Sequence, residues 1–441
     1  MTPKSDTKSA FLNNVNERSD ELERISQDIL SHPESGYKEQ RTSELVANWF
    51  RTAGFEVQTG IGLTGVAATL DTGKPGPHIA VMGELDSLVV PGHSFADENT
   101  GAAHACGHHA QIGSMLGVAA GLSQAQIKAE LTGRISFFAT PAEEYIELGF
   151  RESLRAEGQI EFFGGKQEFI KLGFFNDVDI AMLTHTGGET AGTIGVGGSN
   201  NGMIGKTVTY IGRAAHAGGS PHLGINALNA AHLGLAGIHA QRETFRDSDT
   251  VRVHPVITKG GDAVNSVPAN VQLETYVRAS NVPAILNASE KVDRALKAGA
   301  LATGATVEIS TSPGYLPAKY DKQLTEVYRN NAASLIGDDN VIELPHSTGC
   351  TDMGDVSQIV ATIQPTANAT SGTGHGIDYL VENYDLAVIK SAKAMGLTVI
   401  DLLSDNALLA KKISGSFKAP MSISEYLSRM RGFRSVTMFS E

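Results

Sequence analysis

The stretch His78-Ile79-Ala80-Val81-Met82-Gly83 runs directly into Glu84-Leu85-Asp86 and decides the fold class of this chain. A compact apolar run of this kind is typical of a strand buried on both faces of a parallel sheet. It ends in two acidic side chains. Because parallel α/β sheets bind ligands beyond the carboxyl ends of their strands, the stretch predicts both a fold and the edge on which a site lies.

Two further apolar runs have the same form. The run Arg134–Ala139 leads into Glu143 and Glu144, and the run Val178–Leu183 leads into His185. Strands that alternate with helices in this way predict a mostly parallel α/β domain. We therefore expect the polar side chains after the three strands to converge in one crevice.

Composition excludes several classes of protein. The 441 residues carry a net charge of -13 and no cluster of lysine or arginine, which argues against nucleic acid or an anionic membrane as a partner. Only Cys106 and Cys350 are present, so a disulfide framework is excluded. No leader-like or membrane-spanning apolar segment is evident, and we expect a cytoplasmic protein.

The chain is long enough for two to three domains. A glycine-rich stretch from Gly195 to Gly205 reads as a linker, and the residues after it predict two helices on an antiparallel sheet. We therefore expect a discontinuous catalytic domain over residues 1–198 and 311–441, with an α+β domain over residues 199–310 inserted into it.

The stretch from Ala103 to Gln111 places one of the two cysteines among histidines. A thiolate and an imidazole two residues apart, Cys106 and His108, on a glycine-hinged turn that opens a helix, face one small volume and suit a divalent metal. The alternative is a small buried cysteine beside histidines that cap the helix. His104 and His109 are assigned to capping or to supporting the ligands, and Cys350 to the structure.

The other strand ends supply further ligands. With Glu144, His185 and His375, the pair Cys106 and His108 forms a set able to hold two divalent ions, with the sulfur between them. Zinc is the first choice and manganese the second. Glu143 is then free to act as general base: a metal polarises a carbonyl, bridging hydroxide attacks it, and Glu143 carries the proton to the leaving nitrogen. The alternative for Glu143 and Glu144 is a solvated pair at the surface. The alternative for His375 is an ordinary loop histidine without a metal.

Together these motifs make the chain resemble the aminoacylase and glutamate carboxypeptidase family of di-metal peptidases. Within that family it is most similar to the amidohydrolase branch, which includes hippurate, indoleacetyl-amino-acid and p-aminobenzoyl-glutamate hydrolases. The motifs that carry the resemblance lie in the family's order along nearly the whole chain: His32–Tyr37, Glu84–Leu88, His104–His108, Pro141–Glu144, His185, Gly212–His222, Arg278 and His375.

The resemblance implies roles for individual residues. It makes Cys106 the bridging thiolate, assigns His108 and His185 to one ion and Glu144 and His375 to the other, and makes Glu143 the general base. Asp86 becomes a supporting acid behind the ligands. The inserted domain becomes a lid and dimerisation domain from which His216 reaches into the active site of the partner protomer to stabilise the oxyanion. Asn265 and Arg278 are then lid residues near the substrate carboxylate.

Two positions depart from the branch's pattern. His109 stands where the branch has Asp or Asn, and Glu84 stands where it has Asp. The segment Glu147–Phe175 and the loop Thr351–Val356 are more similar to the p-aminobenzoyl-glutamate hydrolase type than to the hippurate type.

We therefore expect a homodimeric two-metal amidohydrolase that acts on small N-acyl or N-aroyl amino acids. The rival within the same class is a dipeptidase that acts on unmodified dipeptides. Two alternatives from other classes are a thiol hydrolase with Cys106 as nucleophile and a catalytically silent binding relative.

Overall fold

The computed structural model describes residues 3–440, which form two compact units. The first unit contains the chain up to Ser199 together with Lys319–Pro345 and Asp355–Ile423. The second contains Asn200–Ala318, His346–Gly354 and the chain from Ser424 onward.

The first unit is built on a six-stranded sheet in which β6, β3, β7 and β19 are parallel neighbours. Every residue of β3 is buried, as expected for a strand covered on both faces. The predicted fold class, a mixed α/β domain with a mostly parallel sheet, is confirmed. In sheet order the strands are β1 (Glu56–Ile61), β2 (Gly65–Asp71), β6 (Arg134–Thr140), β3 (His78–Glu84), β7 (Ile180–Leu183) and β19 (Ala361–Ile363).

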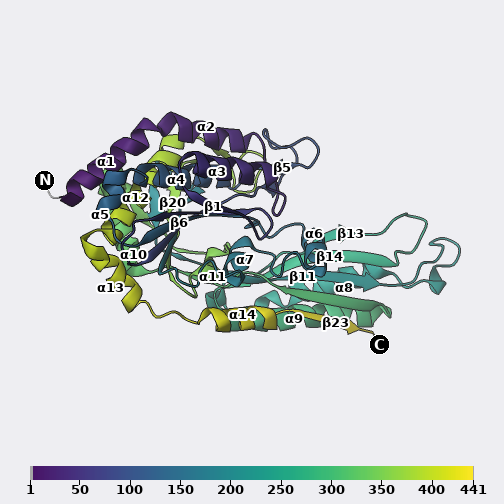
Figure 1. Cartoon of the computed structure of the whole chain (residues 1–441). Helices are drawn as coiled ribbons and strands as arrows, with labels where there is room; N and C mark the ends of the chain where they lie inside the picture. The colour runs from purple at the N-terminus through teal and green to yellow at the C-terminus, as the bar shows by residue number, and fades with distance from the viewer. Residues whose placement is uncertain (1–2, 441) are drawn as a thin grey trace. The chain divides into compact units, whose positions relative to one another are not determined.

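Helix α4 (His108–Leu122) is buried along its whole length beneath other helices. It packs against α1 (Pro3–Glu17), α2 (Ser19–Leu30), α12 (Ser391–Leu403) and β3 (Figure 1). Three glycines four residues apart allow this approach, since a Cβ on Gly113, Gly117 or Gly121 would overlap Ser26, Ala392 or Phe11 respectively. The helix that begins at His108 is therefore held on several sides.

Smaller elements complete the first unit. A four-stranded sheet contains β17 (Val341–Glu343), β9 (Ile194–Val196), β20 (Thr366–Asn368) and β8 (His185–Gly187). Two hairpins are formed by β4 (Leu88–Val89) with β5 (Ala102–Ala103) and by β21 (Thr370–Ser371) with β22 (Leu380–Val381). Other helices of this unit are α3 (Gln40–Thr52), α5 (Ala125–Glu130), α6 (Leu148–Ala156), α7 (Gly165–Lys171), α10 (Lys322–Ile336), a π-helix over Asp385–Lys390 and α13 (Leu408–Ser416).

The second unit is an antiparallel sheet with two long helices, α8 (Ala227–Ala240) and α9 (Val282–Thr303), packed on it. Buried and more exposed residues alternate along β14, as expected for a sheet with one covered face. In order the strands are β12 (Arg252–Val253), β14 (Asn270–Ala279), β11 (Gly202–Ile211), β15 (Thr306–Pro313) and β23 (Ser435–Phe439), and β13 (Val256–Lys259) also pairs with β14.

The C-terminal segment differs from expectation. We expected residues 311–441 to stay with the first unit, yet β23, drawn in yellow in Figure 1, pairs with β15 over Val307–Thr311. A short, mostly exposed edge strand has little periodic signal, and the pairing joins segments far apart in the sequence. At the other end of the chain, helices α1 and α2 meet at Arg18. Within residues 3–440, no helix is long and apolar enough to cross a membrane.

Candidate metal centre

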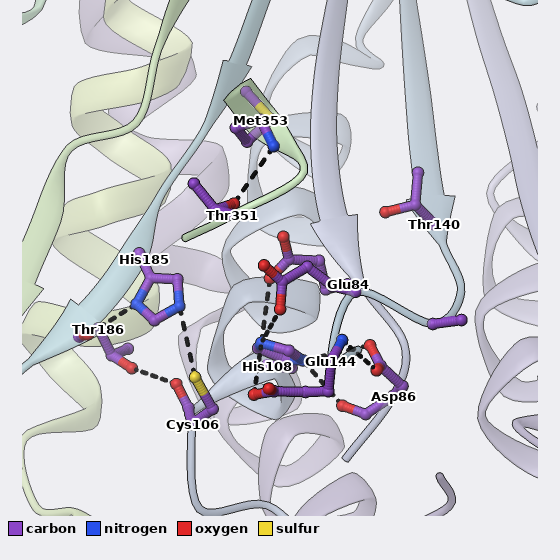
Figure 2. A network of polar contacts seen from close by, with 12 residues as sticks. Glu84, Asp86, Cys106, His108, Thr140, Glu144, His185, Thr186, Thr351 and Met353 are labelled. Carbon is purple, nitrogen blue, oxygen red and sulfur yellow. Dashed lines mark hydrogen bonds and ion pairs between the residues drawn. The ribbon is translucent and has the colours of Figure 1, made fainter. Parts of the chain in front are cut away.

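The carboxyl ends of three neighbouring parallel strands bring the predicted polar side chains together. Strand β3 ends at Glu84 and is followed by Asp86, β6 is followed by Glu143 and Glu144, and β7 is followed by His185 at the start of β8. Figure 2 shows Glu84, Asp86, Glu144 and His185 from these strand ends gathered around Cys106 and His108.

The turn that carries Cys106 and His108 requires glycine at its middle position. Gly107 caps α4 with φ 87°, in the left-handed region. A Cβ at this position would lie 2.0 Å from Thr186 Oγ1 and 2.8 Å from the Tyr379 hydroxyl oxygen. The Thr186 hydroxyl also donates a 3.0 Å hydrogen bond to the Cys106 carbonyl oxygen, which ties the turn to β8.

Two groups of three side chains meet at the Cys106 sulfur. The ligand atoms of Cys106, His108 and His185 lie within 4.8 Å of one another, and so do those of Cys106, Glu144 and His375. Cys106 Sγ is 3.6 Å from His185 Nε2, and Glu144 Oε1 is 3.6 Å from His375 Nε2. The five predicted ligands therefore share one small volume, with the thiol common to both groups.

Backbone carbonyls orient the two histidine rings. The Nδ1–H of His108 donates to the Asp86 carbonyl oxygen at 2.8 Å, and that of His185 donates to the Thr186 carbonyl oxygen at 2.7 Å. In the neutral ring each bond leaves Nε2 unprotonated and free to bind an ion, which is the arrangement that a metal-binding histidine needs.

The loop that presents Glu143 and Glu144 is held in a strained conformation. Ala142 has φ 52°, in the left-handed region that a residue with a side chain rarely adopts. Its N–H donates to the buried Glu39 carboxyl at 2.8 Å, and Thr64 donates to the other Glu39 oxygen at 2.6 Å. The Glu144 N–H in turn donates to Asp86 Oδ2 at 2.9 Å.

His375 reaches the centre from the hairpin loop between β21 and β22. Its backbone has φ 65°, and its N–H donates to the Ala105 carbonyl oxygen at 2.9 Å. The side chain is exposed, unlike those of His108 and Glu144. The loop thus brings a predicted ligand from late in the chain to the turn that precedes Cys106.

The electrostatics of the centre suit a cation. Burial, and then the Glu144 carboxylate, raise the pKa of Cys106 well above its usual value, so the thiol by itself is a poor nucleophile at neutral pH. Burial opposes ionisation of Glu84, but Lys166 and His108 together lower the pKa of its carboxyl to about 2.

The buried atoms test whether a metal fits. Among the described residues, four buried atoms of the centre make no hydrogen bond: Glu84 Oε2, Asp86 Oδ1, His108 Nε2 and Glu144 Oε1. Leaving such atoms without a partner in a protein interior is costly. Thiol, imidazole and carboxylate donors are the groups that bind zinc and manganese, so the residues fit divalent metal ions.

Several residues named from the sequence lie elsewhere. His109 is buried on α4, where its Nε2 is 3.2 Å from the Tyr384 hydroxyl oxygen, and its ring lies beside that of His104. In the second unit, His216 is exposed and bridges to Ser266, next to Asn265, and its Nδ1 accepts N–H bonds from Gly218 and Gly219. Arg278 is half-buried on β14.

Comparison with known proteins supplies the family. The model of "Peptidase family M20/M25/M40" matches residues 80–400, which include the strand ends and all five predicted ligands. The chain belongs to this family. The family resemblance predicted from the motifs is thereby confirmed, and this M20 peptidase is a hydrolase that acts on amide bonds.

Individual relatives of this M20 peptidase have different names. It is 29% identical to the Xaa-Arg dipeptidase of Mus musculus over 94% of this chain and 93% of that one. It is 30% identical to one of the two chains of the p-aminobenzoyl-glutamate hydrolase of Escherichia coli over 70% of this chain and 67% of that one. A solved structure, the Bacillus subtilis YXEP protein, described as a dinuclear metal binding peptidase from the M20 family, matches with a TM-score of 0.64 at 22% identity over 88% of this chain and 99% of that one.

Sequence reasoning missed four residues that hold the centre of this M20 peptidase in place. Glu39 was not predicted, and Glu84 was placed at the end of a strand and in a motif without a role in the centre. Arg151 is fully buried and donates to the carbonyl oxygens of Ala142, Glu144 and Phe163. Lys166 is fully buried against Glu84. A signal for Lys166 was available, because it is the one basic residue between the apolar pairs Phe162-Phe163 and Phe169-Ile170.

Proposed function

We propose that this M20 peptidase is a metal-dependent amidohydrolase that cleaves the amide bond between an acyl or aroyl group and an amino acid. The observation that supports the proposal is the pair of three-residue groups that share Cys106 Sγ. A thiolate common to two ligand groups suits two neighbouring ions, with positions left open for water and substrate.

His108 and His185 would hold one ion, Glu144 and His375 the other, and Cys106 both. The thiolate and imidazoles favour zinc, and the carboxylate with imidazole also suits manganese. When bound, divalent ions polarise an amide carbonyl and make a water molecule a nucleophile at neutral pH.

Glu143 carries the proton in this proposal. It follows β6 beside the ligand Glu144, and its Oε2 is 3.9 Å from His108 Nε2, so it lies next to the ligands without belonging to either group of three that contains Cys106. Its carboxylate takes a proton from the attacking water and delivers it to the leaving nitrogen. Asp86 holds Glu144 and His108 in position through its carboxylate and its carbonyl oxygen.

The p-aminobenzoyl-glutamate hydrolase among the relatives supports an N-aroyl amino acid substrate. A dipeptide is the second candidate, supported by the Xaa-Arg dipeptidase that matches over 94% of this chain. Both substrates have an amide bond next to a carboxylate, so the same centre would serve either.

We also propose that the second unit is a lid and dimerisation domain that contributes His216 to the site of a partner protomer. Its Nδ1 accepts two backbone N–H bonds, so the neutral ring carries its proton on Nε2 and presents it as a donor for an oxyanion. Asn265 lies beside it, since its carbonyl oxygen accepts the Ala217 N–H, and with Arg278 would bind the substrate carboxylate. Mixing Glu143→Gln and His216→Ala proteins should restore activity if His216 acts across a dimer.

The deciding experiment measures metal and turnover together. Metal content per chain is determined on purified protein, and hydrolysis is assayed before chelation, after it and after metal return. The substrates are p-aminobenzoyl-glutamate, N-acyl amino acids, and dipeptides with and without C-terminal arginine. We expect close to two ions per chain and activity that is lost and then restored with them.

Specific results would contradict the proposal. Turnover that resists chelation but stops on alkylation of Cys106 would make the cysteine a nucleophile. Metal binding without hydrolysis of any substrate would favour a catalytically silent relative. Faster turnover of dipeptides than of every N-acyl amino acid would select the second candidate.

A further inference from the structure

Glu84 and Lys166 form an ion pair that is completely buried beside the metal centre. Lys166 Nζ lies 2.5 Å from Glu84 Oε1, and both side chains are 0% exposed. The lysine comes from α7 and the glutamate from the last position of β3. Burying two charges costs free energy, and apolar side chains of the same size would fill the space without that cost. Stabilisation of the fold therefore does not explain why this ion pair is present.

The second oxygen of Glu84 faces the centre. Glu84 Oε2 lies 3.1 Å from His108 Nε2, yet neither atom makes a hydrogen bond among the described residues. His108 Nδ1 is occupied by the Asp86 carbonyl oxygen, so Nε2 is the atom available to a metal. Ligand atoms of Glu84, His108 and Glu143 lie within 4.8 Å of one another.

The separation of these two atoms matches that of neighbouring ligands on one ion. Two donor atoms about 2.1 Å from the same ion lie about 3.0 to 3.4 Å apart at octahedral to tetrahedral angles. The 3.1 Å between His108 Nε2 and Glu84 Oε2 falls in this range. An ion bound to His108 would therefore have the Glu84 oxygen within reach.

We propose that Glu84 is a sixth protein ligand of the centre, on the ion held by His108, and that Lys166 positions it by binding its other oxygen. The inference rests on the proposed function, because it concerns the same pair of ions. It adds a carboxylate to the Cys106, His108 and His185 group, which favours ions that accept five or six ligands, such as manganese, over strictly tetrahedral zinc. The Lys166 ammonium also offsets one of the negative charges gathered around the site.

The test uses the double variant E84Q/K166M, which removes the two charges of this pair together, so that neither is left buried without the other. K206M/D293N is the matched control, because Lys206 is also fully buried and its Nζ lies 2.7 Å from Asp293 Oδ1 in the second unit. The measurements are metal content and dissociation constants for Mn²⁺ and Zn²⁺ by equilibrium dialysis, visible absorption of the Co²⁺ form, and unfolding of the metal-free proteins.

We expect E84Q/K166M to fold like the wild type but to bind one of the two ions at least tenfold more weakly, with a larger loss for Mn²⁺ and an altered Co²⁺ spectrum. K206M/D293N should bind both ions as the wild type does. Wild-type affinities and an unchanged Co²⁺ spectrum in E84Q/K166M would overturn the inference and leave the proposed function standing. A wild-type protein that binds no metal would overturn both.

Discussion

The Glu144 backbone N–H donates a 2.9 Å hydrogen bond to the fully buried Asp86 carboxylate, which joins the loop after β6 to the end of β3. The carbonyl oxygen of the same Asp86 residue accepts the Nδ1–H of His108 at 2.8 Å. One residue thus orients a predicted ligand of each ion, by its side chain in one case and by its backbone in the other.

Replacing Asp86 should therefore affect the two ions unequally. Asp86→Ala removes the acceptor of the Glu144 N–H but keeps the carbonyl that orients His108. We expect affinity for the ion on Glu144 and His375 to fall about 10- to 100-fold, and affinity for the other ion to fall less. Titration of the two sites by calorimetry checks this. Asp97→Ala is the control, since Asp97 also accepts backbone N–H bonds, from Asn99 and Thr100, but in an exposed loop. Equal losses at both sites would contradict the prediction.

The adjacent acids Glu143 and Glu144 should separate in function. Glu143→Gln keeps the size of the side chain but cannot accept a proton, so we expect kcat to fall about 10²- to 10⁴-fold while both ions remain bound. Glu144→Gln should instead lower metal content. Measuring metal and kcat on the same samples distinguishes the two, and an active Glu143→Gln enzyme would rule out Glu143 as the base.

Gly107→Ala should damage the centre beyond the cost of backbone strain. The new Cβ would overlap Thr186 Oγ1, and the turn between Cys106 and His108 would have to move. Gly73→Ala is the control, because Gly73 also has positive φ, +76°, with nothing within 4 Å of an added Cβ. We expect both variants to lose about 1–2 kcal/mol of unfolding free energy from the left-handed backbone. Only Gly107→Ala should also lose metal affinity, as measured by equilibrium dialysis.

Buried His78 should make the fold sensitive to acid. Burial, and then Arg134, lower the pKa of His78 from 6.5 to about 4. The unfolded chain therefore takes up this proton first as the pH falls, and stability is lost progressively between pH 6.5 and pH 4. At pH 5 the loss attributable to this group is about 2 kcal/mol.

Urea denaturation of the metal-free protein from pH 7.5 to pH 4 measures the effect. His78→Gln should show a shallower fall in unfolding free energy than the wild type. His239→Gln serves as control, because that ring is exposed on α8. The same pH dependence in His78→Gln and the wild type would show that another group is responsible.

Local features of the sequence determined the fold class and the set of predicted ligands. The apolar run from His78 to Gly83 predicts a buried parallel strand, because such a strand must be apolar on both faces. The sequence is enough to predict a set of five ligands, because the chemistry of a donor is a property of residue type and the carboxyl ends of parallel strands meet at one edge. The predicted ligands are Cys106, His108, Glu144, His185 and His375.

Only the tertiary structure decided which distant residues support them. Lys166 lies 82 positions from Glu84, and Glu39 lies 103 positions from Ala142, whose strained backbone it holds. Strand β23 likewise joins the second unit by pairing with β15. Such pairings depend on which buried groups meet once the whole core has packed, so the local spacing of residues does not predict them. Strand periodicity and the types of the ligands, by contrast, can be read from each short segment of the sequence.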